Sequence, residues 1–570
     1  MINKRIADLK KLINLYNIDG YIIPKNDAYF SEYSEPDRLK IATNFSGSAG
    51  FAILLKKKNY LFVDGRYTVQ AQLQSGKNFH IMEIPKFIPK NILKKNKKKI
   101  SLGFDPQLFT NFTLKKNFGI EFNLIPINEN LVDKIYKKKT SKAIKLFYNL
   151  SEKISGEIMS SKINRLLKIM KLKDVNSIFI SAPENVAWLL NIRGRDNPYS
   201  PIPNCKIILT DDRKIFFFSC PKKIKLIKKK KDYKNFTFCT YSDFSKIIYK
   251  LKKGNFCTDS LTCSVSNENL IKKDFNIILN TDPCYIMKSI KNKIELKNII
   301  NAHVEDGLAL TKFIYWIKNI NKKKITEIDA QNKLEKFRKL NKNYLFPSFN
   351  TIAGTGSNGA IVHYRATKKS TKIIEKKDIF LCDSGGQYKY GTTDVTRTIC
   401  FSQQKKSIKD IFTKVLKGHI AVALTNLNYN KTGREIDIRA RKFLKKSGLD
   451  YAHGTGHGVG YFLNVHEGPQ SISKYNSIKI QKGMILSNEP GFYKKNHFGI
   501  RIENLVYATK SKNKFYFENL TLAPIEKDLI NYELLNKNEK NYLFKYHLNI
   551  YVQYSKLLNL KERRWLATFI

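Results

Sequence analysis

The sequence predicts a multidomain protein of α/β and α+β class, in which two α/β domains precede an α+β domain with a largely antiparallel sheet. The length of 570 residues exceeds what a single hydrophobic core usually supports. Strand and helix patterns alternate in residues 1–145 and recur in the same order in 146–284. Residues 285–570 begin with long helical repeats and then become rich in strands. We therefore expect three domains with these boundaries.

The first domain is expected to open with a helix, because apolar residues recur at helical spacing from Ile6 to Tyr16. Another helix is expected to begin at Tyr67. Three segments show the period-2 alternation and turn glycines that are typical of strands: Ile18–Pro24, Asn44–Leu55 and Asn59–Gln72. Three lysines and a threonine at 137–140 mark a candidate linker to the second domain.

The second domain repeats this order with little residue identity. A basic amphipathic helix at Ile158–Met170 precedes a strand at Ser177–Ser181. Two paired strands follow, at Lys206–Leu209 and Lys214–Phe218. We therefore expect the first two domains to share one α/β topology.

The third domain is expected to begin with a long helix at Ser289–Lys318 and a second one at Glu327–Leu340. Further helices are expected at Ile408–Leu424 and Gly433–Ser447, and the tail after residue 525 is expected to be mostly helical. The end of the chain, 563–570, is apolar enough to pack on a neighbouring element or on a second copy. Six segments show strand patterns: Phe349–Gly356, Gly359–Tyr364, Ile379–Gly386, Thr392–Phe401, Met484–Tyr493 and Gly499–Ala508.

Two aspartates stand out in this domain. The stretch Ile379–Arg397 is predicted to form two short strands around a turn at Gly385-Gly386, and each strand delivers one aspartate, Asp383 and Asp394. Paired carboxylates repel each other, and a cation between them removes that cost. The alternative is that both are solvated residues at strand ends. Other segments of the domain decide between these interpretations.

Histidines and glutamates accompany the aspartates. The glycine-rich segment 453–460 carries His453 and His457, and glycine lets a backbone approach a site closely. A lone histidine is more often structural, but two in such a segment favour a site. Two glutamates, Glu489 and Glu503, lie in the last predicted strands. Such an oxygen-rich set of ligands is typical of sites for hard divalent ions such as Mn²⁺, and not of zinc sites built from cysteine thiolates. Paired ions can activate one hydroxide for attack on a carbonyl.

The composition limits the partners and the cellular location that can be expected. The formal net charge of +55 raises the alternative of a nucleic-acid or anionic-surface partner, although lysine enrichment runs along the whole chain and favours compositional drift. The lysine runs at 94–99, 137–139 and 228–231 lack the regular aromatic residues of a stacking surface. The eight cysteines form no CxxC pair, as is typical of reduced cytosolic proteins. No long apolar run and no signal peptide are seen, so a cytoplasmic protein without a membrane partner is expected.

These motifs support a resemblance to a known family. DSGGQYKYGTTDVTRT, HGTGHGVG, NEPG and GIRIEN resemble the segments that carry the five metal ligands of the pita-bread dinuclear metallopeptidases. NFSGSAG, DGRY, ENVAWLLNIRG, KNKIEL, AHVEDG and HYRAT extend the resemblance to the whole chain. The chain resembles the long, three-domain form of the Xaa-Pro aminopeptidases (aminopeptidase P). That resemblance implies two creatinase-N-like α/β domains followed by a pita-bread catalytic domain.

The resemblance also implies a reaction and the residues that carry it. The family removes the first residue from peptides with proline in second position, by attack of a hydroxide that is bound to two metal ions, which we expect to be Mn²⁺. It further implies a homodimer, a cytoplasmic location and no specific nucleic-acid partner. The implied metal ligands are Asp383, Asp394, His457, Glu489 and Glu503. Glu489 would also transfer the proton. The implied substrate contacts are His363, His453, His466 and Arg501, with Arg38 as a looser match. His363 and His466 would also act in catalysis by binding the tetrahedral intermediate, and Arg501 would orient carboxylates.

Four alternatives share parts of this pattern. A prolidase would share the ligands but act on dipeptides, and the middle domain argues against it. Creatinase-like hydrolases keep the fold without the full metal set, and methionine aminopeptidases lack both leading domains. A noncatalytic pita-bread protein that binds nucleic acid would fit the charge, but such proteins usually lack some of the five ligands.

Overall fold

The structure is a computed structural model that describes residues 2–33, 35–93, 99–136, 145–227, 233, 235–320 and 325–570. The predicted linker at 137–140 lies outside the described residues, as do the lysine runs except for Lys99. The chain divides into two compact units. One consists of residues 1–152 and 157–285, and the other of residues 153–156 and 286–570. The predicted boundaries at 145 and 284 stay predictions.

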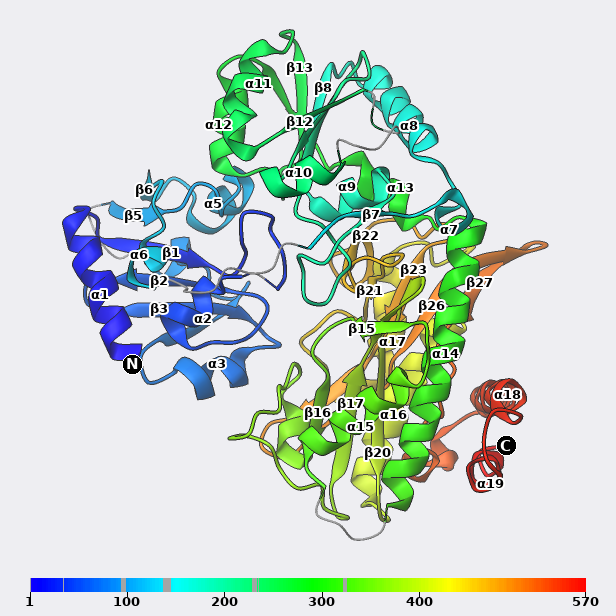
Figure 1. The fold of residues 1–570 in the computed structure, drawn as a ribbon. Coiled ribbons are helices and arrows are strands. Elements are labelled where there is room, and N and C mark those ends of the chain that lie inside the picture. The colour runs from blue at the N-terminus through cyan, green and yellow to red at the C-terminus, as the bar shows by residue number, and fades with distance from the viewer. Residues whose placement is uncertain are drawn as a thin grey trace. The chain divides into compact units, whose positions relative to one another are not determined.

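The first unit contains two six-stranded sheets of the same topology (Figure 1). The strand orders are β4-β3-β2-β1-β5-β6 and β12-β11-β10-β8-β13-β14. In each sheet a central strand, β1 or β8, pairs antiparallel with one neighbour and parallel with the other. The first sheet contains β1 Gly20–Pro24, β2 Phe51–Leu55, β3 Asn59–Asp64, β4 His80–Ile84, β5 Ile100–Phe104 and β6 Phe122–Pro126. The second contains β8 Ser177–Ile180, β10 Lys206–Thr210, β11 Ile215–Phe218, β12 Phe236–Cys239, β13 Asn255–Thr258 and β14 Asn276–Leu279. The repetition expected from the sequence is therefore present.

The predicted helices of this unit form where periodicity placed them. Helix α1 (Ile2–Leu15) buries Ile6, Leu9 and Ile13, which lie on one helical face. Helices α3 (Thr68–Ser75) and α8 (Met159–Leu172) also match their predicted positions. The apolar stripe of each helix is what fixes its place against a sheet.

The second unit begins with two long helices, α14 (Lys293–Asn319) and α15 (Glu327–Lys339). Helix α14 starts four residues later than the Ser289 start that the periodicity predicted. Asn292 has an extended backbone and accepts hydrogen bonds from two backbone amides of the first turn, while Glu295 accepts from the Asn292 amide. This capping box sets the start, because it satisfies donors that no helical carbonyl can reach.

All strand pairings described in this unit are antiparallel. The sheets are β15-β18-β19, β16-β17-β20, β22-β21-β23-β26-β27 and β24-β25. They are built from β15 Tyr344–Pro347, β16 Ile352–Thr355, β17 Ile379–Ser384, β18 Gly386–Tyr388, β19 Gly391–Thr392, β20 Val395–Cys400, β21 Gly456–Gly458, β22 Glu467–Ile472, β23 Ile485–Asn488, β24 Gly491–Lys494, β25 Phe498–Arg501, β26 Asn504–Ser511 and β27 Lys514–Asn519. The predicted α+β class is confirmed.

Two predicted strand features of this unit are wrong. Gly359–Tyr364 is not a strand: the chain forms a 3₁₀ turn, η3 (Gly356–Ala360), and continues as a turn. Gly356 has φ +52°, and the side-chain amide Nδ2 of Asn358 donates to Glu327 Oε1, so the chain folds back here. The turn at Gly385-Gly386 also does not join β17 to β20 directly. The short hairpin β18–β19 lies between them, because β18 pairs with β15 instead.

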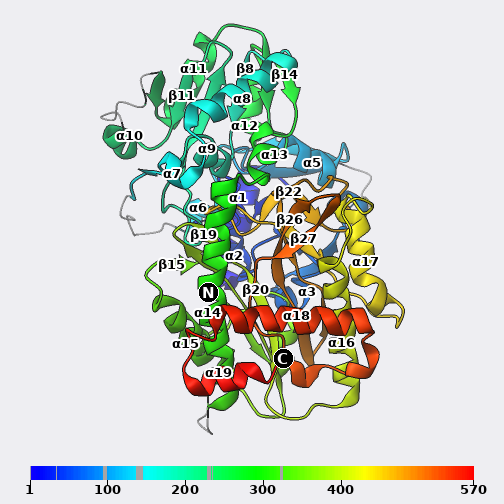
Figure 2. The same ribbon diagram turned by 90° about the vertical axis from the view of Figure 1, so that its right-hand side faces the viewer.

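The C-terminal segment packs on its own unit. Helices α18 (Lys537–Tyr554) and α19 (Leu560–Ala567) lie across the same side of the unit (Figure 2). The Trp565 ring lies 5.6 Å from that of Tyr315 on α14, centroid to centroid. Of the two predictions for residues 563–570, packing on a neighbouring element is the one observed. No helix in the described part of the chain is long and apolar enough to span a bilayer.

Candidate active site

Three carboxylates from distant segments meet at the ends of the antiparallel strands. Asp383 is the fifth residue of β17 and lies opposite Thr396 of β20, while Asp394 directly precedes β20. Glu503 lies between β25 and β26, and its amide donates to the Thr396 carbonyl. Ligand oxygens of Asp383, Asp394 and Glu503 lie within 4.8 Å of one another, and all three residues are buried. Strand pairing therefore places three negative groups at one point.

The remaining two candidate ligands join the same cluster. His457 lies in β21, and its Nε2 is 3.5 Å from Asp394 Oδ2 and 3.5 Å from Glu489 Oε1. Glu489 directly follows β23, and its amide donates to the Thr455 carbonyl. His457, Glu489 and Glu503 also offer ligand atoms within 4.8 Å of one another. The structure thus brings together all five residues that the family resemblance singled out.

The hydrogen bonding of His457 suits a metal ligand. Its Nδ1 lies 2.9 Å from the Gly458 carbonyl, which can only accept a hydrogen bond. The neutral ring therefore carries its proton on Nδ1, and the lone pair of Nε2 faces the carboxylates. This orientation by a backbone carbonyl is the usual arrangement of a metal-binding histidine.

The electrostatics of the cluster also fit divalent cations. Burial, and next the charge of Asp383, raise the pKa of Asp394 well above its ordinary value. Burial and then the charge of Asp394 do the same to the pKa of Glu503. Asp383 Oδ1 is buried and has no hydrogen-bond partner among the described residues. A group of buried carboxylates with an unsatisfied oxygen is costly in itself, and bound divalent ions remove that cost.

Arg501 holds two of the candidate ligands. Its Nη2 donates to Asp383 Oδ2 at 2.6 Å, and its Nε donates to Thr396 Oγ1 at 3.0 Å. The Thr396 hydroxyl in turn donates to Glu503 Oε2 at 2.6 Å. One fully buried guanidinium therefore orients one carboxylate directly and another through a hydroxyl.

Sequence reasoning missed two residues that support the cluster. Ser487 donates from Oγ to Glu489 Oε1 at 3.0 Å and accepts from the His457 amide at 2.9 Å. Because Ser487 lies two residues before Glu489 and therefore on the same face of the strand, the sequence pattern could have indicated this contact. Tyr493 accepts from Arg501 Nη1 at 2.6 Å, and burial raises the pKa of its hydroxyl to about 12. No sequence pattern indicated this tyrosine.

His453 connects to the same network through Tyr493. Its Nδ1 lies 2.7 Å from the Gly454 carbonyl, so its Nε2 accepts from the Tyr493 hydroxyl at 2.9 Å. The ring is thus fixed as a neutral tautomer, two hydrogen bonds away from Arg501. An uncharged, oriented imidazole can line an apolar subsite at lower cost than a cation can.

The other predicted substrate residues lie in different places. The His466 ring packs against that of His457 with centroids 4.5 Å apart, and its ligand atom lies within 4.8 Å of those of Asp394 and His457. His363 follows Val362, whose carbonyl accepts from Arg501 Nη1 at 3.4 Å, so its backbone lies beside the cluster. Arg38 belongs to the first unit, where it forms two hydrogen bonds to Asp133 at 2.6 and 2.9 Å. The roles of these residues stay predictions.

Comparison with known proteins agrees with this geometry. The metallopeptidase family M24 matches residues 297–510, and the C-terminal region of peptidase M24 matches 514–568. Creatinase/prolidase N-terminal domains match residues 5–133 and 137–295.

Individual relatives cover the whole chain. A probable Xaa-Pro aminopeptidase P of Laccaria bicolor is 36% identical over 99% of this chain and 92% of its own length. Xaa-Pro aminopeptidase 1 of Dictyostelium discoideum is 33% identical over 100% of this chain and 96% of its own. The crystal structure of X-prolyl aminopeptidase from Caenorhabditis elegans, described as a cytosolic enzyme with a di-nuclear active site, superposes with a TM-score of 0.93 at 29% identity, covering 100% of this chain and 99% of that one. The chain therefore belongs to the Xaa-Pro aminopeptidases of metallopeptidase family M24, and it carries two creatinase/prolidase-type N-terminal domains.

Proposed function

We propose that this enzyme removes the N-terminal residue from peptides whose second residue is proline, at a centre of two divalent metal ions. The observation that carries the proposal is the convergence of four carboxylates and the Nε2 of His457 at one point, where Asp383, Asp394 and Glu503 are buried and His457 and Glu489 are partly buried. The di-nuclear site described for the Caenorhabditis elegans enzyme supports the number of ions.

The residues proposed to hold the ions are Asp383, Asp394, His457, Glu489 and Glu503. Their oxygen-rich donor set suits Mn²⁺, which prefers carboxylates with few nitrogen ligands. When bound, the pair of ions supplies an activated hydroxide as the nucleophile and polarises the scissile carbonyl.

Side chains of this enzyme carry the proton and hold the peptide. Ser487 fixes Glu489 Oε1, so we assign the proton transfer to Glu489 Oε2, which takes the proton from the attacking water and passes it to the proline nitrogen that leaves. His466 and His363 would hydrogen-bond the substrate and stabilise charge on the carbonyl oxygen. Arg501 keeps Asp383 in place. The role of Arg38 near the substrate entrance is proposed from the resemblance alone.

Proline selectivity has a physical basis. An X–Pro amide lacks an N–H and has a fixed φ, so a site that demands a donor at that nitrogen excludes it. We propose that His453, held neutral by Gly454 and Tyr493, lines a shallow slot for the proline ring.

We further propose a homodimer and a cytosolic location. The outer face of α18 exposes Phe544, Leu548 and Val552, at 46%, 37% and 68% of their maximal surface, spaced four residues apart on one helical face. Such an apolar stripe is typical of a surface that another protein covers. The described residues contain no disulfide bond, which is typical of a reducing compartment. We expect no specific nucleic-acid partner and no membrane partner.

The test is the release of the first residue from a peptide X-Pro-Y, with and without added Mn²⁺, by the wild type and by Glu489→Gln. We expect Mn²⁺-dependent release by the wild type and its loss in the variant. Cleavage of X-Pro dipeptides alone would instead indicate a prolidase. Tight, salt-resistant binding of DNA or RNA without hydrolysis would indicate the noncatalytic alternative.

A further inference from the structure

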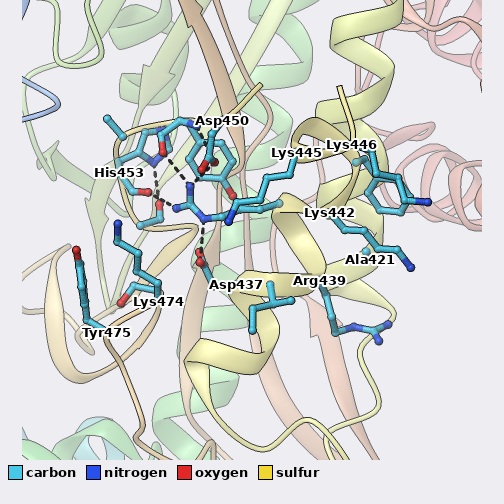
Figure 3. Close-up of a pocket in the computed structure, with 17 residues that line it drawn as sticks. Ala421, Asp437, Arg439, Lys442, Lys445, Lys446, Asp450, His453, Lys474 and Tyr475 are labelled. Carbon is cyan, nitrogen blue, oxygen red and sulfur yellow. Dashed lines mark hydrogen bonds and ion pairs between the residues drawn. The ribbon is translucent and has the colours of Figure 1, made fainter. Parts of the chain in front are cut away.

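A basic pocket of about 860 Å³ opens in the second unit between α17 (Gly433–Lys445) and the loops around His453 and Ser473 (Figure 3). Six of its 17 lining residues are lysine or arginine, whereas these types account for 103 of the 570 residues of the chain. The pocket is therefore more basic than the lysine-rich composition explains. The six are Arg439, Arg441, Lys442, Lys445, Lys446 and Lys474.

Only one of these cations is neutralised. Arg441 pairs with Asp437 at 2.8 Å and with Asp450 at 2.6 Å, which are the only acidic residues of the lining. No ion pair forms between the other five and any residue of the described chain. Arg439 Nε is also buried without a hydrogen-bond partner among the described residues. The pocket thus holds an excess of positive charge that would attract and retain an anion.

The charges are spread along the pocket and accompany an aromatic ring. In Figure 3, Lys474 and Tyr475 lie on one side of Asp437, and Arg439 and Lys442 lie on the other. Tyr475 is 74% exposed, and Lys474 Nζ lies 4.9 Å from the centre of its ring. An exposed ring beside a cation is a surface on which a flat, aromatic ligand can stack.

From this arrangement we infer that the pocket binds a phosphate-bearing aromatic small molecule of the nucleotide class. Four of the five unpaired cations are lysines, which bind phosphate oxygens as compact point charges, and the exposed ring of Tyr475 favours a ligand that also carries an aromatic group. The volume lies within the range of small-molecule sites, roughly 300–1,000 Å³. Tyr475 would stack on the base, and Lys442, Lys445 and Lys446 would bind the phosphates. The pocket shares His453 and Gly454 with the proposed proline slot, but the inference uses neither residue and does not depend on the proposed peptidase function.

The experiment is a calorimetric titration of the full-length, metal-loaded enzyme with ATP. It is carried out in buffer without free metal, at 50 mM and at 150 mM salt. The pocket variant is K442Q/K445Q/K446Q. The matched control is K168Q/K171Q/K173Q, which removes the same charge from α8 and the residue after it in the first unit, where all three lysines are exposed. We expect saturable binding that the pocket variant weakens about tenfold, because each surface charge contributes modestly and three are lost. The control should change the affinity by less than about twofold.

A second variant separates stacking from charge. Tyr475→Ala should weaken ATP about fivefold, the lower bound for one base–aromatic stack, but leave inorganic triphosphate unchanged. Thermal unfolding of each variant should match that of the wild type, because the substituted side chains are exposed.

Three outcomes would overturn the inference. One is the absence of saturable ATP binding at 50 mM salt. Another is equal weakening by the pocket and control variants, which would assign the binding to overall charge. The third is tighter binding of an acidic pentapeptide than of ATP, which would make the ligand a peptide. Binding is measured without turnover, so its failure is distinct from failure of the peptidase assignment.

Discussion

At the scale of single residues, Arg501 and its neighbours decide the state of the candidate ligands. Arg501 holds Asp383 directly, holds Glu503 through Thr396, and holds His453 through Tyr493. Without bound ions, one guanidinium faces four carboxylates, and burial together with mutual repulsion raises the pKa of two of them. The side chains are therefore arranged for a charge that the protein alone does not supply.

Asp394→Asn tests the role of this carboxylate as a ligand. We expect turnover to fall by more than about a hundredfold, since even partners that merely orient ligands contribute about 10- to 100-fold. The metal-free fold should not be weakened, because the neutral amide avoids the buried negative charge that burial and Asp383 disfavour at this position. Metal content, turnover and thermal unfolding in EDTA measure these effects, with the exposed Asp212→Asn as control. Unchanged turnover would contradict the ligand role.

The raised pKa values of Asp394 and Glu503 predict how pH acts on the site. Their carboxyl groups keep protons above the ordinary pKa of about 4, so a bound metal must displace these protons. We expect Mn²⁺ affinity to rise with pH, with net proton release in calorimetry in two buffers of different ionisation enthalpy. By linkage, the metal-free protein should lose stability as pH rises above about 4, because the unfolded chain releases these protons first. Affinity that is independent of pH, without proton release, would refute the shift.

At the scale of elements, buried polar contacts hold α14, α15 and the β18–β19 hairpin together. Arg338 of α15 donates to Asp306 of α14 at 2.7 and 3.3 Å, and both are nearly inaccessible. The Tyr388 hydroxyl of β18 also donates to Asp306 at 2.7 Å. This hairpin was not predicted, since its few residues carry too little periodicity and its partners lie far away in sequence. Long periodic segments such as α1, α8 and α17 were predicted to within a few residues.

Arg338→Ala should lower the free energy of unfolding of this part of the molecule by about 3–5 kcal/mol, because it leaves a buried aspartate unpaired. Urea unfolding followed by hydrogen exchange in α14 and α15 measures the effect. As a comparison, Lys406→Ala breaks an exposed pair with Asp410 and should cost less than about 1 kcal/mol. If both variants lost a similar free energy of unfolding, the buried ion pair would contribute no more to stability than the exposed one.

At the scale of the whole molecule, the formal net charge of +55 should cause adhesion to polyanions. The charge is distributed along the chain and leaves the candidate ligands intact, so we attribute to it adhesion to polyanions and not the enzyme's specificity. Two homologues that span the chain, from Laccaria bicolor and Dictyostelium discoideum, are named as Xaa-Pro aminopeptidases, in agreement with this assignment.

Adhesion to duplex DNA should therefore be independent of sequence and steeply dependent on salt. For about six phosphate contacts, affinity should fall roughly a thousandfold between 50 and 200 mM salt. Fluorescence anisotropy with two unrelated duplexes measures this, and peptide turnover provides the functional readout at each salt concentration. Sequence preference or retention of DNA at 200 mM salt would point back to a nucleic-acid function.

The sequence by itself determined the class of fold, the repetition of the two α/β topologies, and the segments that carry the candidate ligands. These properties are local, because periodicity, turn glycines and short motifs are encoded by adjacent residues. Only the tertiary structure decided that Gly359–Tyr364 turns back, that β18 pairs with β15, and that Tyr493 and Ser487 support the site. It also created the basic pocket from residues of α17 and two loops. The physical reason is that such contacts join residues far apart in the chain, as Arg501 and Asp383 show at a separation of 118 positions, and no local pattern specifies which distant groups will meet.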